Sequence, residues 1–161
     1  MKTAIIYATK HGCTEKCSYT LANELTKDPL LVNLETMKDI DFTQFDLLLL
    51  GGSIHAGMIN KNLKKFIDKN LNQLIKKKVG LFLCCMEEGE KAQEQFNNAF
   101  PEELRNVAKA KGLFGGAFDF EKMNFFEKAI IKKIANIEES VSKIDYKSIS
   151  SFASEINQIK E

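Results

Sequence analysis

The fold is decided by the apolar run Thr3-Ala4-Ile5-Ile6-Tyr7-Ala8, which leads directly into the polar turn Thr9-Lys10-His11-Gly12-Cys13-Thr14. The run predicts a buried strand, and residues 15–27 behind the turn predict a helix. The first N–H groups of a helix lack partners within it, and the helix dipole favours negative charge there. Thr9 and Thr14 add hydroxyl donors, and Gly12 allows a ligand to approach the backbone. The turn therefore predicts a phosphate-binding site.

Apolar runs and helical patterns alternate along the rest of the chain. Further strands are predicted at residues 30–34, 46–51, 79–85 and 112–118. Helices are predicted at residues 60–74, at 89–110 with a break at Pro101, at 122–136, and from 148 onward. Leucine-rich runs that are apolar on both faces indicate a parallel sheet covered by helices on each side. This alternation predicts one α/β domain over residues 1–161, built on an open, doubly wound sheet.

The amino-acid composition is that of an ordinary globular protein and argues against several other classes. The chain has 161 residues, 44% of them hydrophobic and 28% charged, as in ordinary globular proteins. Its formal charge of +1, with Lys and Glu interspersed, argues against nucleic-acid binding. No apolar run approaches the roughly 20 residues that span a bilayer, and no signal-peptide pattern is present. We therefore expect a cytoplasmic protein.

The four cysteines are Cys13, Cys17, Cys84 and Cys85. Cytosolic chains of this size rarely form disulfides, so buried free thiols are expected. Cys13 and Cys17 have the i, i+4 spacing that suits metal ligation on a helix. A second alternative is thiol chemistry at Cys13, because a helix N-terminus can lower a thiol pKa. Adjacent Cys84 and Cys85 should point to opposite faces of the sheet.

In a doubly wound sheet, ligands bind beyond the carboxyl ends of the strands, near the point where strand order reverses. Three predicted loops lie there, at residues 9–14, 52–58 and 86–89. The first loop lacks the G-x-x-x-x-G-K-[ST] pattern of nucleoside-triphosphate sites and the G-x-G-x-x-G pattern of dinucleotide sites. A short, hydroxyl-rich loop of this kind favours a terminal monophosphate.

These motifs resemble those of flavodoxins. The first loop is similar to the flavodoxin phosphate loop, approximately [ST]-x-T-G-x-T, with matches at Thr9, Gly12 and Thr14 and with His11 where threonine is usual. Residues 47–57, 115–118 and 125–133 resemble segments of the menaquinone-dependent protoporphyrinogen oxidases, a branch of the flavodoxin-like superfamily. The resemblance implies a five-stranded sheet of order 2-1-3-4-5 and FMN as the cofactor.

The resemblance also implies which residues contact FMN. The phosphate is expected on the first loop, and the ring between the second and third loops. The implied cofactor-binding residues are Thr9, Lys10, His11, Gly12, Cys13, Thr14, Ser53, Ile54, His55, Ala56, Gly57, Met58, Cys85, Met86, Glu87 and Glu88. Because the flavin carries the chemistry, we assign no catalytic side chain and no metal ligands.

Several functions remain open at this point. One is an FMN-dependent oxidoreductase that passes electrons from a porphyrinogen or another small substrate to a quinone or similar acceptor. A second is a flavodoxin-type shuttle that carries electrons between redox partner proteins. A third is a binding module without redox function, suggested by His11 and by loops that lack Trp, Tyr and Phe.

The predicted helix at residues 122–136 has an apolar stripe and several lysines. We expect Phe126, Ile130, Ile131 and Ile134 to pack on the core. The alternative is peripheral contact with a membrane or with a quinone-bearing partner.

Overall fold

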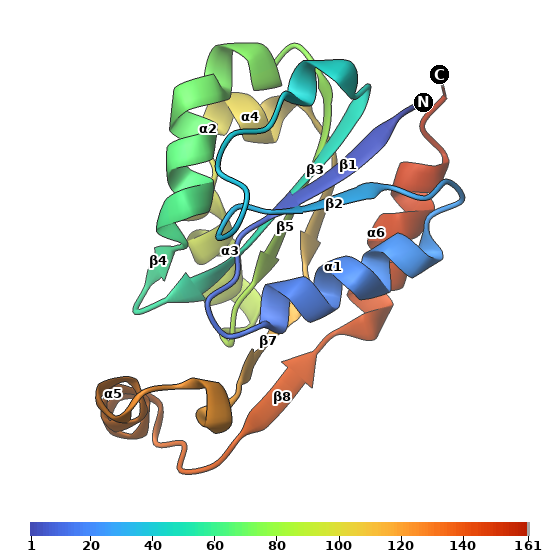
Figure 1. Ribbon diagram of the computed structural model, residues 1–161. Coiled ribbons are helices and arrows are strands. Elements are labelled where there is room, and N and C mark those ends of the chain that lie inside the picture. The colour runs from blue at the N-terminus through green and yellow to red at the C-terminus, as the bar shows by residue number, and fades with distance from the viewer. Residues whose placement is uncertain (161) are drawn as a thin grey trace.

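The computed structural model describes residues 1–160 and is built around a parallel β-sheet (Figure 1). Its main strands are β1 (Thr3–Tyr7), β2 (Leu30–Asn33), β3 (Leu47–His55), β5 (Lys78–Cys84) and β6 (Ala108–Leu113). They lie in the order β2-β1-β3-β5-β6, and each neighbouring pair is parallel. If the short β4 is set aside, this is the order 2-1-3-4-5. The predicted doubly wound α/β fold is confirmed.

Helices cover both faces of the sheet (Figure 1). One face packs against α2 (Lys61–Leu74), α3 (Gly89–Ala99) and α4 (Glu102–Val107). The other face packs against α1 (Cys13–Glu24) and α6 (Tyr146–Asn157). The predicted break at Pro101 separates α3 from α4, but the predicted continuation to residue 110 is wrong, since β6 begins at Ala108.

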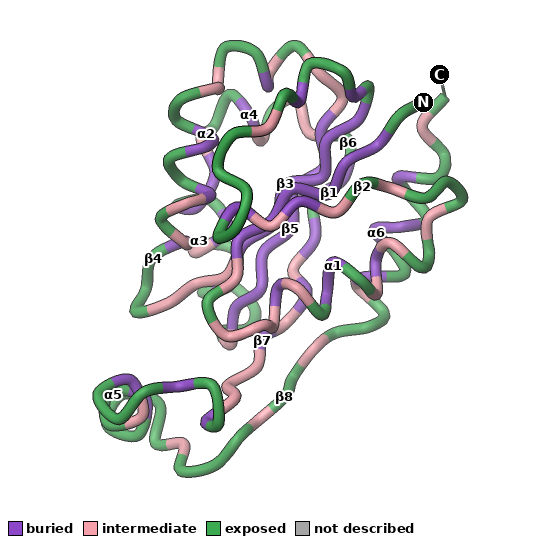
Figure 2. The backbone as a smooth tube through the Cα atoms, viewed as in Figure 1, coloured by how far each residue is buried: buried purple, intermediate pink, exposed green. Residues whose placement is uncertain are grey.

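The central strands are apolar on both sides because each side has its own core. In β3, Leu48 and Leu50 point into the core beside α2, whereas Leu47 and Leu49 point into the core beside α1 and α6. All four side chains are fully buried, and each such burial contributes about 2 kcal/mol. Figure 2 shows the buried strands running through the middle of the molecule.

The second predicted loop is instead part of a hairpin. β3 continues through His55, and His55 pairs antiparallel with Met58 of β4 (Met58–Ile59). The two intervening residues, Ala56 and Gly57, have φ of 49° and 77°. Positive φ at both positions is the geometry of a two-residue hairpin turn that matches the twist of its strands. The paired glycines before Ser53 therefore do not end the strand, contrary to the prediction.

The predicted fifth strand at residues 112–118 is split. β6 ends at Leu113, and β7 (Gly115–Phe118) leaves the sheet to pair antiparallel with β8 (Val141–Ile144). Gly115, with φ of 69°, makes the change of direction. A Cβ on Gly115 would lie 1.9 Å from the Lys143 carbonyl oxygen, so only glycine fits here.

The segment between β7 and β8 contains the short helix η2 (Phe120–Lys122) and the helix α5 (Phe125–Ala135), while a further short helix, η1 (Phe42–Gln44), precedes β3. Figure 1 shows α5 at the far end of the β7–β8 ribbon, apart from the other helices. The prediction that its apolar stripe packs on the core is wrong for most of the stripe. Ile131 is buried, but Phe126, Ile130 and Ile134 are 77%, 49% and 75% exposed. Both faces of the sheet are already covered by the other helices.

Within residues 1–160, no helix combines the length and the apolar character needed to cross a membrane.

The position of Gly115 generates a stability prediction. Gly115→Ala should lower the free energy of unfolding by roughly 3 kcal/mol, because the new Cβ meets a backbone carbonyl in addition to the strain of positive φ. Gly89→Ala is the matched control: φ is +60° there, but no atom lies within 4 Å of the Cβ position, so only about 1 kcal/mol is expected. Urea unfolding of both variants measures the difference, and equal losses would contradict this account of β7.

Candidate functional site

The three predicted loops meet at the carboxyl edge of the sheet. The rings of His11 in the first loop and His55 at the end of β3 have centroids 5.5 Å apart. His55 also lines a cavity with Met86 and Glu87 of the third loop. The structure therefore brings the three predicted segments around one site, as expected for parallel strands that end at the same edge.

The first loop has the geometry of an anion cradle. Thr9 Oγ1 accepts a hydrogen bond of 2.9 Å from the Gly12 N–H, which folds the loop back on itself. Gly12 has φ of 89° and precedes the first residue of α1, and no side chain in the described chain caps this helix. The N-terminal N–H groups of α1 are consequently left for an external acceptor.

Unpartnered polar atoms mark the same place. Within residues 1–160, the buried side-chain nitrogen and oxygen atoms with no hydrogen-bond partner are Thr14 Oγ1, both ring nitrogens of His11, and Gln95 Oε1. Thr14 and His11 belong to the first loop, and Gln95 lines the adjoining cavity. A buried polar group without a partner costs about 1–3 kcal/mol, so these atoms indicate a missing ligand. A phosphate would accept from the Thr14 hydroxyl and from a His11 N–H, so the loop fits one, whereas Gln95 Oε1 is itself an acceptor and needs a donor.

Cations surround the loop. Lys122 Nζ lies 2.9 Å from the position that a Cβ on Gly12 would occupy, so its ammonium sits over the loop backbone. Lys10 belongs to the loop itself and pairs with the carboxylate of Glu127. Together with the α1 dipole, these charges favour a bound anion.

Glu127 is the acidic group of the site. It lies in the first turn of α5, where it forms a capping box with Asn124. Its carboxylate pairs with Lys10, and its Oε2 lies 3.6 Å from His11 Nε2. The hydrogen bond from Lys10 and the N–H of Asn124 keep the pKa of Glu127 below its usual range, even though burial opposes them. Glu127 is therefore ionised at neutral pH, and it pairs with Lys10 and lies beside His11 in the loop at residues 9–14.

A cavity of about 370 Å³ adjoins the loop. One wall is the β3–β4 turn with Met86 and Glu87, and the other is the apolar side of α5. Its large apolar lining residues are Ile54, Met86, Phe118, Ile130, Ile131, Ile134 and Ile137. Burial, reinforced by the positive charge of Lys10, lowers the pKa of His55 at the edge of the cavity. A cavity of this size and character suits a flat, largely apolar group.

Not every predicted contact residue faces this space. Met58 is 65% exposed at the tip of the hairpin, and the exposed carboxylate of Glu88 lies 3.4 Å from Lys143 Nζ. The Cys85 side chain points into the core beside α2 and α3, so only its backbone is near the site.

Four residues at the site were not predicted from the sequence, namely Glu127, Lys122, Gln95 and Phe118. The pattern Asn124-x-x-Glu127 identifies the start of α5, but nothing local relates it to residues 9–14.

The cysteines are free and buried, apart from the half-buried Cys13, as predicted. Cys84 and Cys85 point to opposite faces, which is also confirmed. The pKa of Cys13 is lowered to about 4. The first cause is the hydrogen bond from the Cys17 thiol, followed by that from Cys84, rather than the helix N-terminus that the sequence suggested.

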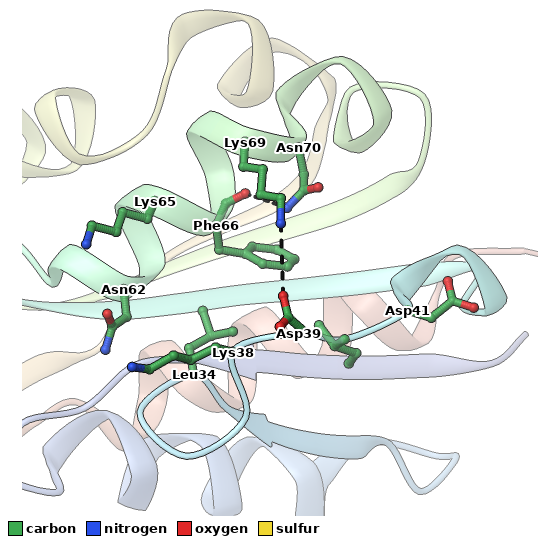
Figure 3. A pocket seen from close by; sticks show the side chains of 10 residues that line it. Leu34, Lys38, Asp39, Asp41, Asn62, Lys65, Phe66, Lys69 and Asn70 are labelled. Atoms are coloured by element: carbon green, nitrogen blue, oxygen red, sulfur yellow. Dashed lines mark hydrogen bonds and ion pairs between the residues drawn. The ribbon is translucent and has the colours of Figure 1, made fainter.

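A separate cavity of about 440 Å³ lies between α2 and the segment after β2 (Figure 3). Its side chains include Lys38, Lys65 and Lys69, and Lys69 lies 4.0 Å from Asp39 across the opening. None of the unpartnered buried atoms found in the described chain belongs to it. It lies outside the three predicted loops, and we place the functional site at the anion loop instead.

Comparisons with known proteins agree with this geometry. A family model for the flavodoxin domain matches residues 4–145. The curated flavodoxin-like domain-containing protein BilS of Clostridioides difficile (strain CD3) is 29% identical over 84 residues, which cover 51% of this chain and 46% of that protein. The match thus spans less than half the length of that relative.

Solved structures share the fold over nearly the full length. Oxidised flavodoxin 1 from Bacillus cereus has a TM-score of 0.62 at 18% identity, covering 99% of this chain and 100% of that one. Oxidised flavodoxin 2 from Bacillus cereus has a TM-score of 0.59 at 20% identity, covering 96% and 97%. At these identities the likeness concerns the fold.

The pairing of Glu127 with the loop generates a binding prediction. Glu127→Gln should strengthen binding of inorganic phosphate about five-fold, because Lys10 and His11 are freed from a competing carboxylate. Glutamine can keep the capping box, so α5 should persist. Isothermal titration with phosphate measures the effect.

Glu139→Gln is the matched control for this variant. Glu139 is an exposed residue of the same segment and makes the same change in net charge. It should leave the affinity unchanged, and an equal gain in both variants would show that net charge alone is responsible.

Proposed function

The chain belongs to the flavodoxin domain family, and from this membership we propose that it binds FMN and transfers electrons to a redox partner. The observation that carries the proposal is the anion loop (residues 9–14), where the Thr14 hydroxyl is buried without a partner in the first turn of a helix that has no side-chain cap. FMN has a terminal monophosphate, which is the acceptor that this loop lacks.

Each part of the site has a role in holding the cofactor. The phosphate would bind the N–H groups at the start of α1 and the Thr14 hydroxyl, with Lys122 as the nearby cation. The apolar cavity would exclude water from the ring, and the β3–β4 turn and Met86 would flank it. The predicted contacts at residues 9–14, 53–58 and 85–88 thus stay a proposal, with Met58 and the Cys85 side chain as the weakest of them.

The bound flavin supplies the one- or two-electron chemistry. The protein's own contribution is electrostatic. Glu127 and Glu87 place negative charge near the cavity, whereas Lys10 and Lys143 place positive charge there. These groups set the potential at which the site accepts an electron. His55, with its lowered pKa, is neutral at physiological pH and adds no charge of its own.

A second candidate is an oxidoreductase with its own substrate, such as a porphyrinogen, and a quinone acceptor. The exposed side chains of α5 favour it, because they offer an apolar surface for such a molecule: Ile130 and Ile134 line the cavity, and Phe126 is exposed on the same helix. Porphyrinogen turnover with a quinone acceptor would support this enzyme. Reduction and reoxidation by protein partners, without such turnover, would support the electron carrier.

The test of cofactor binding compares FMN with riboflavin. The two share the ring and ribityl chain and differ in the phosphate. We expect FMN to bind at least about 100-fold more tightly, since several charge-assisted hydrogen bonds depend on the phosphate. Fluorescence titration of the purified protein measures both affinities. Equal affinities, or no binding of FMN, would contradict the proposal.

Thr14→Val makes the prediction specific to one side chain. It removes a buried hydroxyl that has no partner and keeps the shape. The variant should therefore be as stable as the wild type, or more stable, without FMN, and should bind FMN about ten-fold more weakly. Thr20→Val is the control, because Thr20 lies on the same helix and its hydroxyl already donates to the Lys16 carbonyl oxygen. Loss of FMN affinity in Thr20→Val alone would contradict the assignment.

A further inference from the structure

Three thiols gather where the anion loop (residues 9–14) leads into α1. Cys13 is the first residue of α1, Cys17 follows one turn later, and Cys84 is the last residue of β5. The three Sγ atoms all lie within 4.8 Å of one another. They come from two rigid elements, a helix and a central strand, so that their positions are fixed by packing rather than by a mobile loop.

The distances between the three Sγ atoms are close to those found around a metal ion bound by three thiolates. A metal–thiolate bond is about 2.3 Å, so three sulfurs in a plane around one ion are separated by about 4 Å. The observed separations, at most 4.8 Å, would contract by less than about 1 Å. Small rotations of the three side chains would be enough.

The surroundings favour a soft ion. Cys17 and Cys84 are buried, at 0% and 2% exposure, in the apolar core beside α6. Cys13 is half-buried and lines an opening at the loop, which gives an entry path. Among residues 1–160, no His, Asp, Glu or further Cys joins this group as a fourth ligand. Zinc in structural sites takes four ligands, whereas thiolate sulfur selects Cu(I), which does not require a fourth.

The anionic sulfur cluster also has compensating charge. The N-terminus of α1 lies at Cys13, and the helix dipole favours negative charge there. Lys16 adds positive charge beside it.

We propose that Cys13, Cys17 and Cys84 form a binding site for a soft, thiophilic cation, with Cu(I) as the preferred ion. Cys17 and Cys84 lie outside the loop proposed to hold the phosphate, whereas Cys13 belongs to it, and the proposal does not rest on FMN binding.

The test titrates the reduced, metal-free protein with Cu(I), without oxygen, against a chromophoric Cu(I) chelator. We expect one tightly held Cu(I) per chain and an ultraviolet thiolate-to-metal charge-transfer band. Cys17→Ala and Cys84→Ala should each weaken Cu(I) binding by about 100-fold or more, since even outer partners of a metal site contribute 10–100-fold.

Cys85→Ala is the matched control. Cys85 is adjacent to Cys84 and equally inaccessible, but it points to the opposite core. It should keep wild-type affinity, although it loses the same buried sulfur. Cys13→Ser changes a half-buried position and is therefore the variant least expected to disturb folding. Urea unfolding of all four cysteine variants shows which of them remain folded.

Three outcomes would overturn the proposal. The first is a Cu(I) affinity in Cys85→Ala as low as in Cys84→Ala. The second is wild-type Cu(I) binding no tighter than that of a folded Cys13→Ser variant. The third is tighter binding of Zn(II) than of Cu(I) by the wild-type protein in parallel competition titrations.

Discussion

The structure depends on one electrostatic requirement: where β1 leads into α1, the Thr14 hydroxyl has no partner in residues 1–160, and the N-terminus of α1 has no side-chain cap. Thr14 is fully buried, yet its hydroxyl has no partner, and α1 has no side-chain cap. In an ordinary strand-to-helix turn, a serine or aspartate at the N-cap would remove this cost. Gly12 stands there instead, and it leaves the backbone open to an outside anion. The same residues therefore lower the stability of the protein without a ligand and provide the binding site for an anion.

The segment between β7 and β8 supplies part of the charge around this loop. Gly115 diverts the chain out of the sheet, and the diverted segment returns two charged groups to the loop, the cation of Lys122 and the anion of Glu127. Lys122 supplements the cradle, whereas Glu127 engages Lys10 and His11 within it. Because α5 also forms a wall of the apolar cavity, its position links the charge at the loop to the shape of the cavity.

The sequence predicts the parts of this molecule that follow from local pattern. Leu47–Leu50 are apolar on both faces, which is enough to place them in a covered parallel sheet, and the order of the elements gives the doubly wound arrangement. The turn at Thr9–Thr14 is recognised because its donors are contiguous in sequence. The hairpin at Ala56-Gly57 is missed, because alanine is not a usual residue at positive φ.

The rest depends on contacts between distant residues. The amphipathic pattern of α5 is the same whether its stripe packs on a core or remains exposed, so Ile134 cannot be placed from the pattern alone. Glu127 reaches Lys10 only because Gly115 turns the chain, and Cys84 approaches Cys17 only through the pairing of the sheet.

The most direct measurement of the central claim, that the loop at residues 9–14 binds the phosphate of FMN, is the phosphorus-31 resonance of FMN in the presence of excess protein. Free phosphate monoesters titrate with a pKa of about 6, and a phosphate held by the loop should stay dianionic, with a shifted resonance that does not change between about pH 5.5 and 8. A resonance that titrates as it does in free FMN would contradict the account.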